Sequence, residues 1–219
     1  MHFSVFGFPV EIQPTAFVLA GVVLLFGINS GQPMYYLLAL ILVGAVSILV
    51  HELGHALSAS AFRAGPISIT LHGMGGATRH RRTGTWWKEL LVILAGPFAG
   101  FVLAAFLLPL YLFVPLPDRL LMLVELGVSI NIAWGIFNLL PVYPMDGGQA
   151  LAYGLHAVTK PVNAWLVAHV VGVALAVLLA LYAATSGRLF IAMIVAMFAY
   201  QNVQGFQRVW AIRNSGRRG

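Results

Sequence analysis

The chain has 219 residues, of which 60% are apolar and only 8% are charged. Soluble domains carry roughly 25% charged residues, so this composition argues against a soluble fold and is typical of a polytopic membrane protein. The formal net charge is +6 at neutral pH, but the basic residues fall in loops and near the C-terminus. We therefore expect them to face lipid headgroups at the membrane surface, and we expect no nucleic-acid partner.

Six apolar segments, separated by Gly, Pro and Asn breaks and by the few charges, are candidates for membrane-spanning helices. Their expected bounds are 14–28, 34–62, 87–114, 120–140, 162–185 and 189–204. The first segment is short for a full span. We expect an all-α polytopic membrane protein with about six transmembrane helices. It would form one domain over residues 1–219, with a short basic tail from about residue 207.

Two stretches read as extended chain rather than helix. Residues 3–12 mix Phe, Val and Ile with Gly7 and Pro9, which is typical of a short strand before the first span. Residues 67–72 alternate apolar and polar side chains and then meet a glycine-rich segment at 73–76. We expect short β-strands at the membrane surface in both places, with a covering loop as the alternative for the second.

The distribution of Lys and Arg among the loops predicts the orientation in the membrane. With the N-terminus inside, the cytosolic segments hold Arg63, Arg79, Arg81, Arg82, Lys88, Lys160, Arg208, Arg213, Arg217 and Arg218. The opposite side holds only Arg119 and Arg188. By the positive-inside rule, this bias predicts an even number of spans with both termini in the cytosol.

The sequence HELGH, formed around His51, Glu52 and His55, ends an apolar run that holds no charged side chain after Glu11. Positions i and i+4 of a helix lie about 40° apart around its axis, so both imidazoles project from one face. That spacing suits two nitrogen ligands of a zinc ion, with the glutamate close enough to act on the water that the metal activates. The motif therefore predicts a zinc site within the membrane.

A catalytic zinc usually has three protein ligands, so a third ligand is needed beyond the two histidines. Asp146 is the most distinctive acidic residue, because it follows Pro141 and Pro144 and precedes Gly147 and Gly148. The backbone can turn sharply there and present the carboxylate inward. An intramembrane carboxylate is costly unless it is paired or metal-bound, which makes it a functional hypothesis. The alternative is an aspartate that caps a helix beginning at the glycine pair.

These motifs together resemble those of the site-2 protease family of intramembrane zinc metallopeptidases, peptidase family M50. The resemblance rests on HELGH, on Leu94-Ala-Gly96-Pro97 and on Asn138-Leu-Leu-Pro141-Val-Tyr-Pro-Met-Asp146-Gly147-Gly148. It covers essentially the whole chain and leaves no room for the PDZ-like or CBS-type domains of some members. We therefore expect a minimal catalytic core. Gly100 departs from the family pattern, in which many relatives carry a polar residue.

The resemblance implies one Zn²⁺ per chain, bound by His51, His55 and Asp146, with Glu52 as the general base. Asn138 is similar to the family's asparagine, which would bind the substrate backbone or the oxyanion, or hold the loop that carries the motif. The implied activity is endopeptidase cleavage of single-span or membrane-anchored proteins in a prokaryotic plasma membrane. Tethered transcription factors, sigma or anti-sigma factors and signal-peptide remnants are the substrate classes implied. The oligomeric state stays open.

A substrate helix must unwind locally before its peptide bond can be attacked, and its freed backbone groups then need new partners. The edge of a strand at 67–71 would supply them by β-augmentation. Ile67, Ile69 and Leu71 are therefore candidate substrate-binding residues, and a proline at position 69 would be expected to reduce proteolysis without removing zinc.

Two other functions compete with proteolysis. A six-span transporter or channel would explain buried polar groups in apolar helices, but it gives no reason for Glu52 between two histidines. A family member that has lost proteolysis and acts as a membrane binding module would keep the fold, but the intact Glu52 argues against it.

Overall fold

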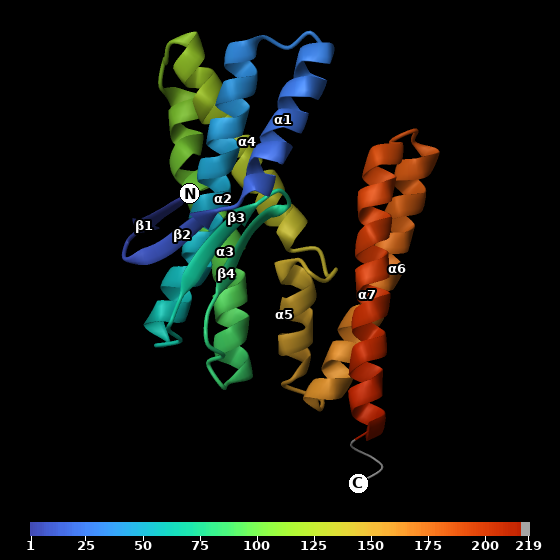
Figure 1. Cartoon of the computed structure of the whole chain (residues 1–219). Helices are drawn as coiled ribbons and strands as arrows, with labels where there is room; N and C mark the ends of the chain where they lie inside the picture. Colours follow the sequence, from blue (N-terminus) through green and yellow to red (C-terminus); the bar gives the residue numbers. More distant parts are fainter. Residues whose placement is uncertain (216–219) are drawn as a thin grey trace. The chain divides into compact units, whose positions relative to one another are not determined.

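The computed structural model describes residues 1–215. These divide into two compact units, which are described separately: the first unit holds 1–83 and 95–136, and the second holds 84–94 and the chain from 137 onward. In chain order the helices and strands are β1 (His2–Val5), β2 (Phe8–Ile12), α1 (Pro14–Asn29), α2 (Met34–Ala61), β3 (Ser68–His72), β4 (Gly75–Arg79), α3 (Trp86–Phe113), α4 (Asp118–Asn138), α5 (Asp146–Leu155), α6 (Pro161–Thr185) and α7 (Leu189–Ser215) (Figure 1).

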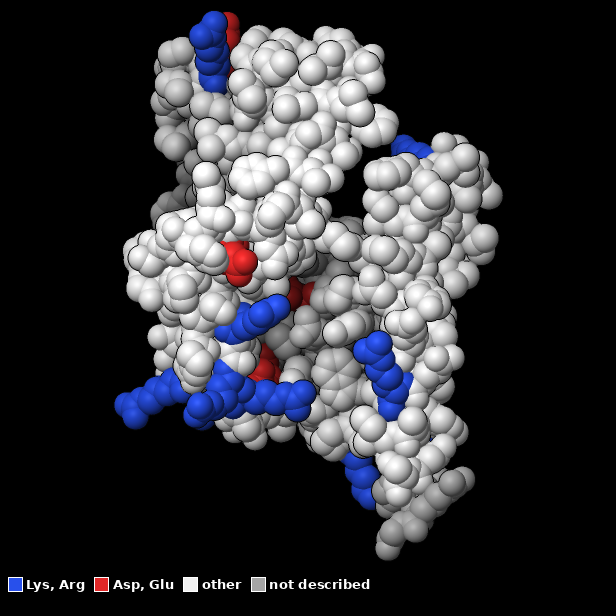
Figure 2. All heavy atoms as spheres, viewed as in Figure 1, with Lys and Arg blue, Asp and Glu red and all other residues white. Residues whose placement is uncertain are grey.

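Five helices of the described chain are long and apolar enough to cross a membrane, namely α2, α3, α4, α6 and α7. Helix α1 is also apolar but has only 16 residues. Large apolar side chains such as Phe17, Phe106 and Phe113 stay exposed on these helices, and most of the surface in Figure 2 is free of Lys, Arg, Asp and Glu. Lipid suits such a surface far better than water does. The predicted helical membrane protein, with a short first segment, is confirmed.

The first unit carries a four-stranded sheet in the order β1-β2-β3-β4. The pairs β1–β2 and β3–β4 are antiparallel, whereas β2 and β3 run parallel. Residues 3–12, expected as one strand, belong to a β1–β2 hairpin that turns at Phe6 and Gly7, whose φ angles are 50° and 82°. Glycine adopts such an angle without steric cost. The predicted strands at the N-terminus and after the second span are confirmed, and the loop alternative is excluded.

The interior position of β3 corrects one expectation. Ile69 pairs with Val10 of β2 on one side and with Thr78 of β4 on the other. The prediction that Ile67, Ile69 and Leu71 offer an open strand edge to a substrate is therefore wrong. Strand β2 of the N-terminal hairpin covers one hydrogen-bonding edge of β3. The glycine-rich segment continues as strand β4, which covers the other edge. Within the described sheet, the outer strand on this side is β4.

In the second unit, helices α6 and α7 lie side by side along most of their length (Figure 1). The core of this unit joins Ala176 and Phe198 of these helices to Val142 and Met145 of the preceding loop. The loop 139–145, which we call the motif loop, is therefore anchored in the packed core through Val142 and Met145.

Helix α7 extends well beyond its expected end at residue 204. Phe206 stacks on Trp210 with ring centroids 5.9 Å apart, and the Arg213 guanidinium lies 5.3 Å from the Trp210 ring. Pairs at spacings of three and four residues stabilise a helix, so the helix continues through the expected basic tail to Ser215. Arg217 and Arg218, predicted to be cytosolic, lie outside the described residues.

Candidate metal centre

His51, Glu52 and His55 lie in the C-terminal half of α2 and are buried, with exposed fractions of 3%, 4% and 8%. The Nε2 atoms of the two histidines are 3.2 Å apart, and their rings meet edge to face. Two nitrogens bound to a tetrahedral zinc at its usual bond length lie about 3.3 Å apart. The two imidazoles therefore fit a zinc ion, and among residues 1–215 these three form the one such cluster found.

Glycines of α2 and α3 allow the two helices to approach closely at this cluster. A Cβ on Gly54 would overlap the backbone carbonyl of Ala95, and a Cβ on Gly96 would overlap the imidazole of His55. Gly96 therefore provides the space in which that ring lies. This glycine directly precedes Pro97 in the Leu94–Pro97 motif. Gly100, one turn later, faces the side chain of Asn131 of α4 instead.

Strand β4 holds the carboxylate of Glu52. The Thr78 hydroxyl lies 2.7 Å from Glu52 Oε2 and 3.0 Å from the Glu52 carbonyl oxygen, so its single proton is donated to this residue. A Cβ on Gly76 would overlap the Glu52 side chain, so only glycine allows the strand to pass this close. Sequence reasoning missed Thr78, because its role depends on how β4 packs against α2.

A buried polar pair ties α2 to α4 one turn before the metal cluster. The Asn131 side-chain amide donates to Ser47 Oγ at 2.9 Å and to the Gly127 carbonyl at 2.7 Å. Both side chains are 2% exposed. Ser47 precedes His51 by four residues on the same helix face. Asn131 thus faces the neighbouring helix α2 and not the lipid.

Asp146 belongs to the second unit, so its role as third ligand stays a prediction. It is the first residue of α5, is 8% exposed and follows Met145 as N-cap. A Cβ on Gly147 would overlap the Leu139 carbonyl, and one on Gly148 would overlap the backbone of the motif loop. The glycine pair thus presses the first turn of α5 against this loop. Because α5 begins at Asp146, this aspartate is not the N-cap, and the helix dipole stabilises its negative charge.

A fully buried amide in α7 holds the motif loop in place. Asn202 Nδ2 donates to the Tyr143 carbonyl at 2.6 Å and to the Phe198 carbonyl at 2.8 Å. Its Oδ1 lies 3.3 Å from His169 Nδ1 of α6. His169 is therefore a structural histidine, and Asn202 is a residue that sequence reasoning missed. An amide in an otherwise apolar helix was the available signal.

The other candidates lie in the second unit as well. Asn138 is the last residue of α4 and is partly buried, and its proposed roles stay predictions. His156 lies in the turn after α5 against the Tyr153 ring, with centroids 5.2 Å apart. Burial lowers the pKa of His156 below its ordinary value of 6.5, which favours the neutral ring. This agrees with a structural histidine.

Three comparisons with known proteins bear on this site. The profile of peptidase family M50 matches residues 115–181. A Synechocystis sp. protein provisionally named a zinc metalloprotease is 35% identical over 158 residues, which are 68% of this chain and 42% of that protein. A zinc metalloprotease of Methanocaldococcus jannaschii is 27% identical over 207 residues, covering 94% of this chain and 60% of that protein.

Among solved structures, the site-2 protease from Methanocaldococcus jannaschii matches with a TM-score of 0.70. The sequences are 24% identical, and the match covers 94% of each chain. The present chain spans 42% and 60% of the lengths of the two related proteins above. Because the two sequences are only 24% identical, the structural match shows a shared fold and no more.

The fold and the buried cluster define a polytopic membrane protein with a site suited to zinc. The chain matches the profile of peptidase family M50 over residues 115–181, is similar to two zinc metalloproteases, and has the fold of a site-2 protease.

Proposed function

We propose that this chain is an intramembrane zinc endopeptidase that cleaves transmembrane or membrane-anchored proteins. The observation that carries the proposal is the buried cluster of His51, Glu52 and His55 in an apolar helix, with the two Nε2 atoms at the separation that zinc requires. A transporter needs no such cluster.

His51 and His55 would hold the metal, and Asp146 would complete the ligand set from the second unit. A buried carboxylate at a helix N-terminus, pressed into place by two glycines, supports this role for Asp146. When bound, zinc polarises the scissile carbonyl and lowers the pKa of the attacking water to about 7.

Glu52 is the proposed general base and acid. It accepts a proton as the water oxygen bonds to the scissile carbon, and it returns that proton to the amine nitrogen as the C–N bond breaks. The Thr78 hydrogen bond and the contact with Gly76 fix the carboxylate for both transfers. Because Glu52 is only 4% exposed, little bulk water competes for its proton.

Strand β4 is the proposed docking edge for an unwound substrate segment. It is one of the two outer strands of the described sheet and contacts Glu52 through Gly76 and Thr78. A substrate strand paired with β4 would gain partners for its freed backbone groups beside the proposed base. Asn138 would contribute either a hydrogen bond to the substrate or support for the motif loop.

The proposed setting is a prokaryotic plasma membrane with both chain termini in the cytosol. The excess of Lys and Arg on one side supports this orientation, in which the C-terminal end of α2 would face the cytosol. Membrane-tethered transcription factors, sigma or anti-sigma factors and signal-peptide remnants are the proposed substrate classes, and the whole chain would act as one catalytic domain.

The test is a cleavage assay with purified protein in detergent, a panel of single-span peptides and a parallel measurement of bound zinc. Wild-type protein should cleave at least one peptide, whereas Glu52→Gln should keep its zinc and lose at least about 1,000-fold of the activity, since both proton transfers depend on the carboxylate. Equal activity of the two proteins would refute the proposal.

A further inference from the structure

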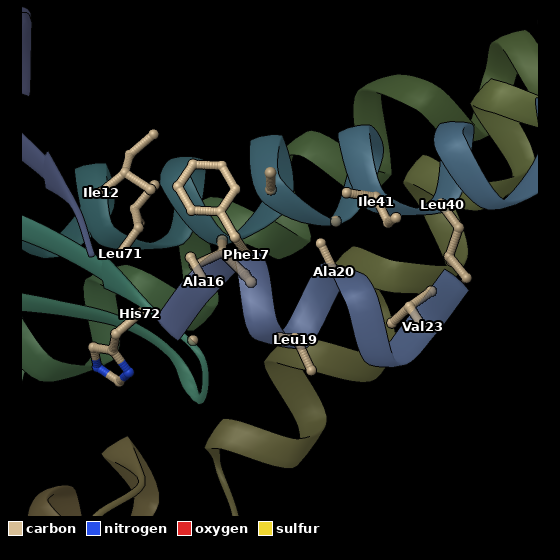
Figure 3. A pocket seen from close by; sticks show the side chains of 14 residues that line it. Ile12, Ala16, Phe17, Leu19, Ala20, Val23, Leu40, Ile41, Leu71 and His72 are labelled. Atoms are coloured by element: carbon tan, nitrogen blue, oxygen red, sulfur yellow. The ribbon is translucent and has the colours of Figure 1, made fainter. Parts of the chain in front are cut away.

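An apolar cavity of about 280 Å³ lies in the first unit between α1, α2 and the β3–β4 hairpin. Ala16 and Ala20 of α1 and Ile41 of α2 border it from opposite sides (Figure 3). Gly44 and Ala45 of α2 also line the cavity, so small residues keep the two helices from filling the space between them.

The cavity adjoins the proposed base through two elements. Along α2, its lining residue Ile48 precedes Glu52 by four positions and so lies on the same helix face. Along the sheet, its lining residue Gly75 is followed directly by Gly76, which contacts Glu52. The cavity lining therefore comes to about one helical turn from Glu52 along α2 and reaches the first residue of β4.

We infer that this cavity is a specificity pocket that receives one large apolar side chain of the substrate, such as Phe or Leu. The inference rests on the proposed function and adds a sequence preference to it. A cavity of about 150 Å³ already holds a benzene ring, so the present volume accommodates a phenyl or isobutyl group. A substrate paired with β4 would place alternate side chains toward the sheet face and bring one of them to the cavity beside Gly75.

Two helical glycines provide a matched pair of test substitutions. A Cβ on Gly44 meets nothing within 4 Å, and this residue lines the cavity, so Gly44→Leu fills the space without a backbone clash. Gly21 of α1 has equally open space but does not line the cavity, so Gly21→Leu is the control. Ala20→Leu fills the same space from α1 and serves as a second variant if Gly44→Leu does not fold.

The experiment uses one cleaved single-span peptide, remade with Phe, Leu or Ala at each position flanking the scissile bond. For one of these positions, Gly44→Leu should lower kcat/KM for the Phe and Leu peptides by about tenfold or more. It should leave kcat/KM for the Ala peptide within about twofold of the wild-type value. Gly21→Leu should leave all three unchanged. Equal loss for all peptides, as a lipid-filled or purely structural cavity would give, or no loss at all, overturns the inference.

Binding of the same peptides to Glu52→Gln protein separates this inference from the proposed function. If wild-type protein cleaves nothing, the proposed function fails, and the pocket is then judged by binding alone. Gly44→Leu added to Glu52→Gln should weaken binding of the Phe peptide by about tenfold relative to the Ala peptide. An unchanged ratio of the two affinities contradicts a side-chain pocket.

Discussion

Gly96 determines where the imidazole of His55 can lie, because a methyl group at this position would overlap the ring. Gly96→Ala should displace the imidazole and weaken zinc binding by about 10–100-fold, the range found when groups that orient a metal ligand are changed. Competition with a chromophoric chelator measures this affinity in purified protein.

Gly100→Ala is the matched control, since it adds the same methyl group one turn along α3. There the added Cβ would lie 3.4 Å from the Asn131 amide oxygen and away from the histidines. Zinc affinity should stay within about twofold of wild type. If both alanine variants bind zinc equally well, His55 does not depend on Gly96 for its position.

Thr78 acts through Glu52 and is a positioning residue. Thr78→Val removes the hydroxyl from a buried carboxylate, and hydrogen bonds to charged groups contribute about 1.5–3 kcal/mol. We expect kcat to fall by roughly 10–100-fold, while the zinc content stays at the wild-type level. Thr78→Ser keeps the hydroxyl and should retain most of the wild-type activity. If Thr78→Ser is as inactive as Thr78→Val, Thr78 acts only through packing.

At the scale of elements, the helix that carries HELGH could be predicted because its signal is local. The spacing of His51 and His55 needs only helical periodicity, and the long apolar runs predict spans by composition. The partners of these residues could not be predicted in this way. Thr78 reaches Glu52 only through the pairing of β3 with β4 and the packing of that hairpin on α2.

Strand β3 shows the same limit for sheets. Its alternating pattern predicted the strand correctly, but edge and interior strands of a small sheet share that pattern, and only the parallel pairing with β2 decides between them. Substrate pairing is therefore proposed for β4. The end of α7 was also predicted too early, since charges in its last turns suggested a tail although aromatic pairs keep the chain helical.

Asn202 connects α6, α7 and the motif loop through buried hydrogen bonds. Asn202→Ala would leave the Tyr143 carbonyl without this donor, and such losses cost about 1–3 kcal/mol. We expect a lower midpoint of thermal unfolding, measured by tryptophan fluorescence. We also expect a lower specific activity, measured by peptide cleavage. The control is Gln207→Ala, an exposed amide on the same helix, which should change neither. Equal midpoints for the two variants would contradict the role of Asn202.

At the scale of the whole molecule, the depth of the metal centre follows from its place in α2. His51 and His55 lie ten and six residues before the end of the helix at Ala61, which corresponds to about 15 Å and 9 Å along its axis. The hydrocarbon core of a bilayer is about 30 Å thick. The site therefore lies in the C-terminal half of α2, nearer the C-terminal end of the helix than its N-terminal end.

Helix α1 differs from the other membrane helices in length. Its 16 residues extend for about 24 Å, less than the thickness of the hydrocarbon core. Short apolar helices are accommodated by local thinning of the bilayer. Such thinning beside α1 would bring lipid headgroups and water closer to the apolar cavity that α1 and α2 share.

The position of the cut in a membrane-embedded substrate tests the central claim most directly. Wild-type protein and a single-span substrate are placed together in liposomes, and the intact masses of the products are measured. An intramembrane zinc endopeptidase should cut within the apolar span, in the half nearer the cytosolic side, and Glu52→Gln should give no product. A cut only in the polar flanks, with the apolar span left intact, would contradict the proposed function.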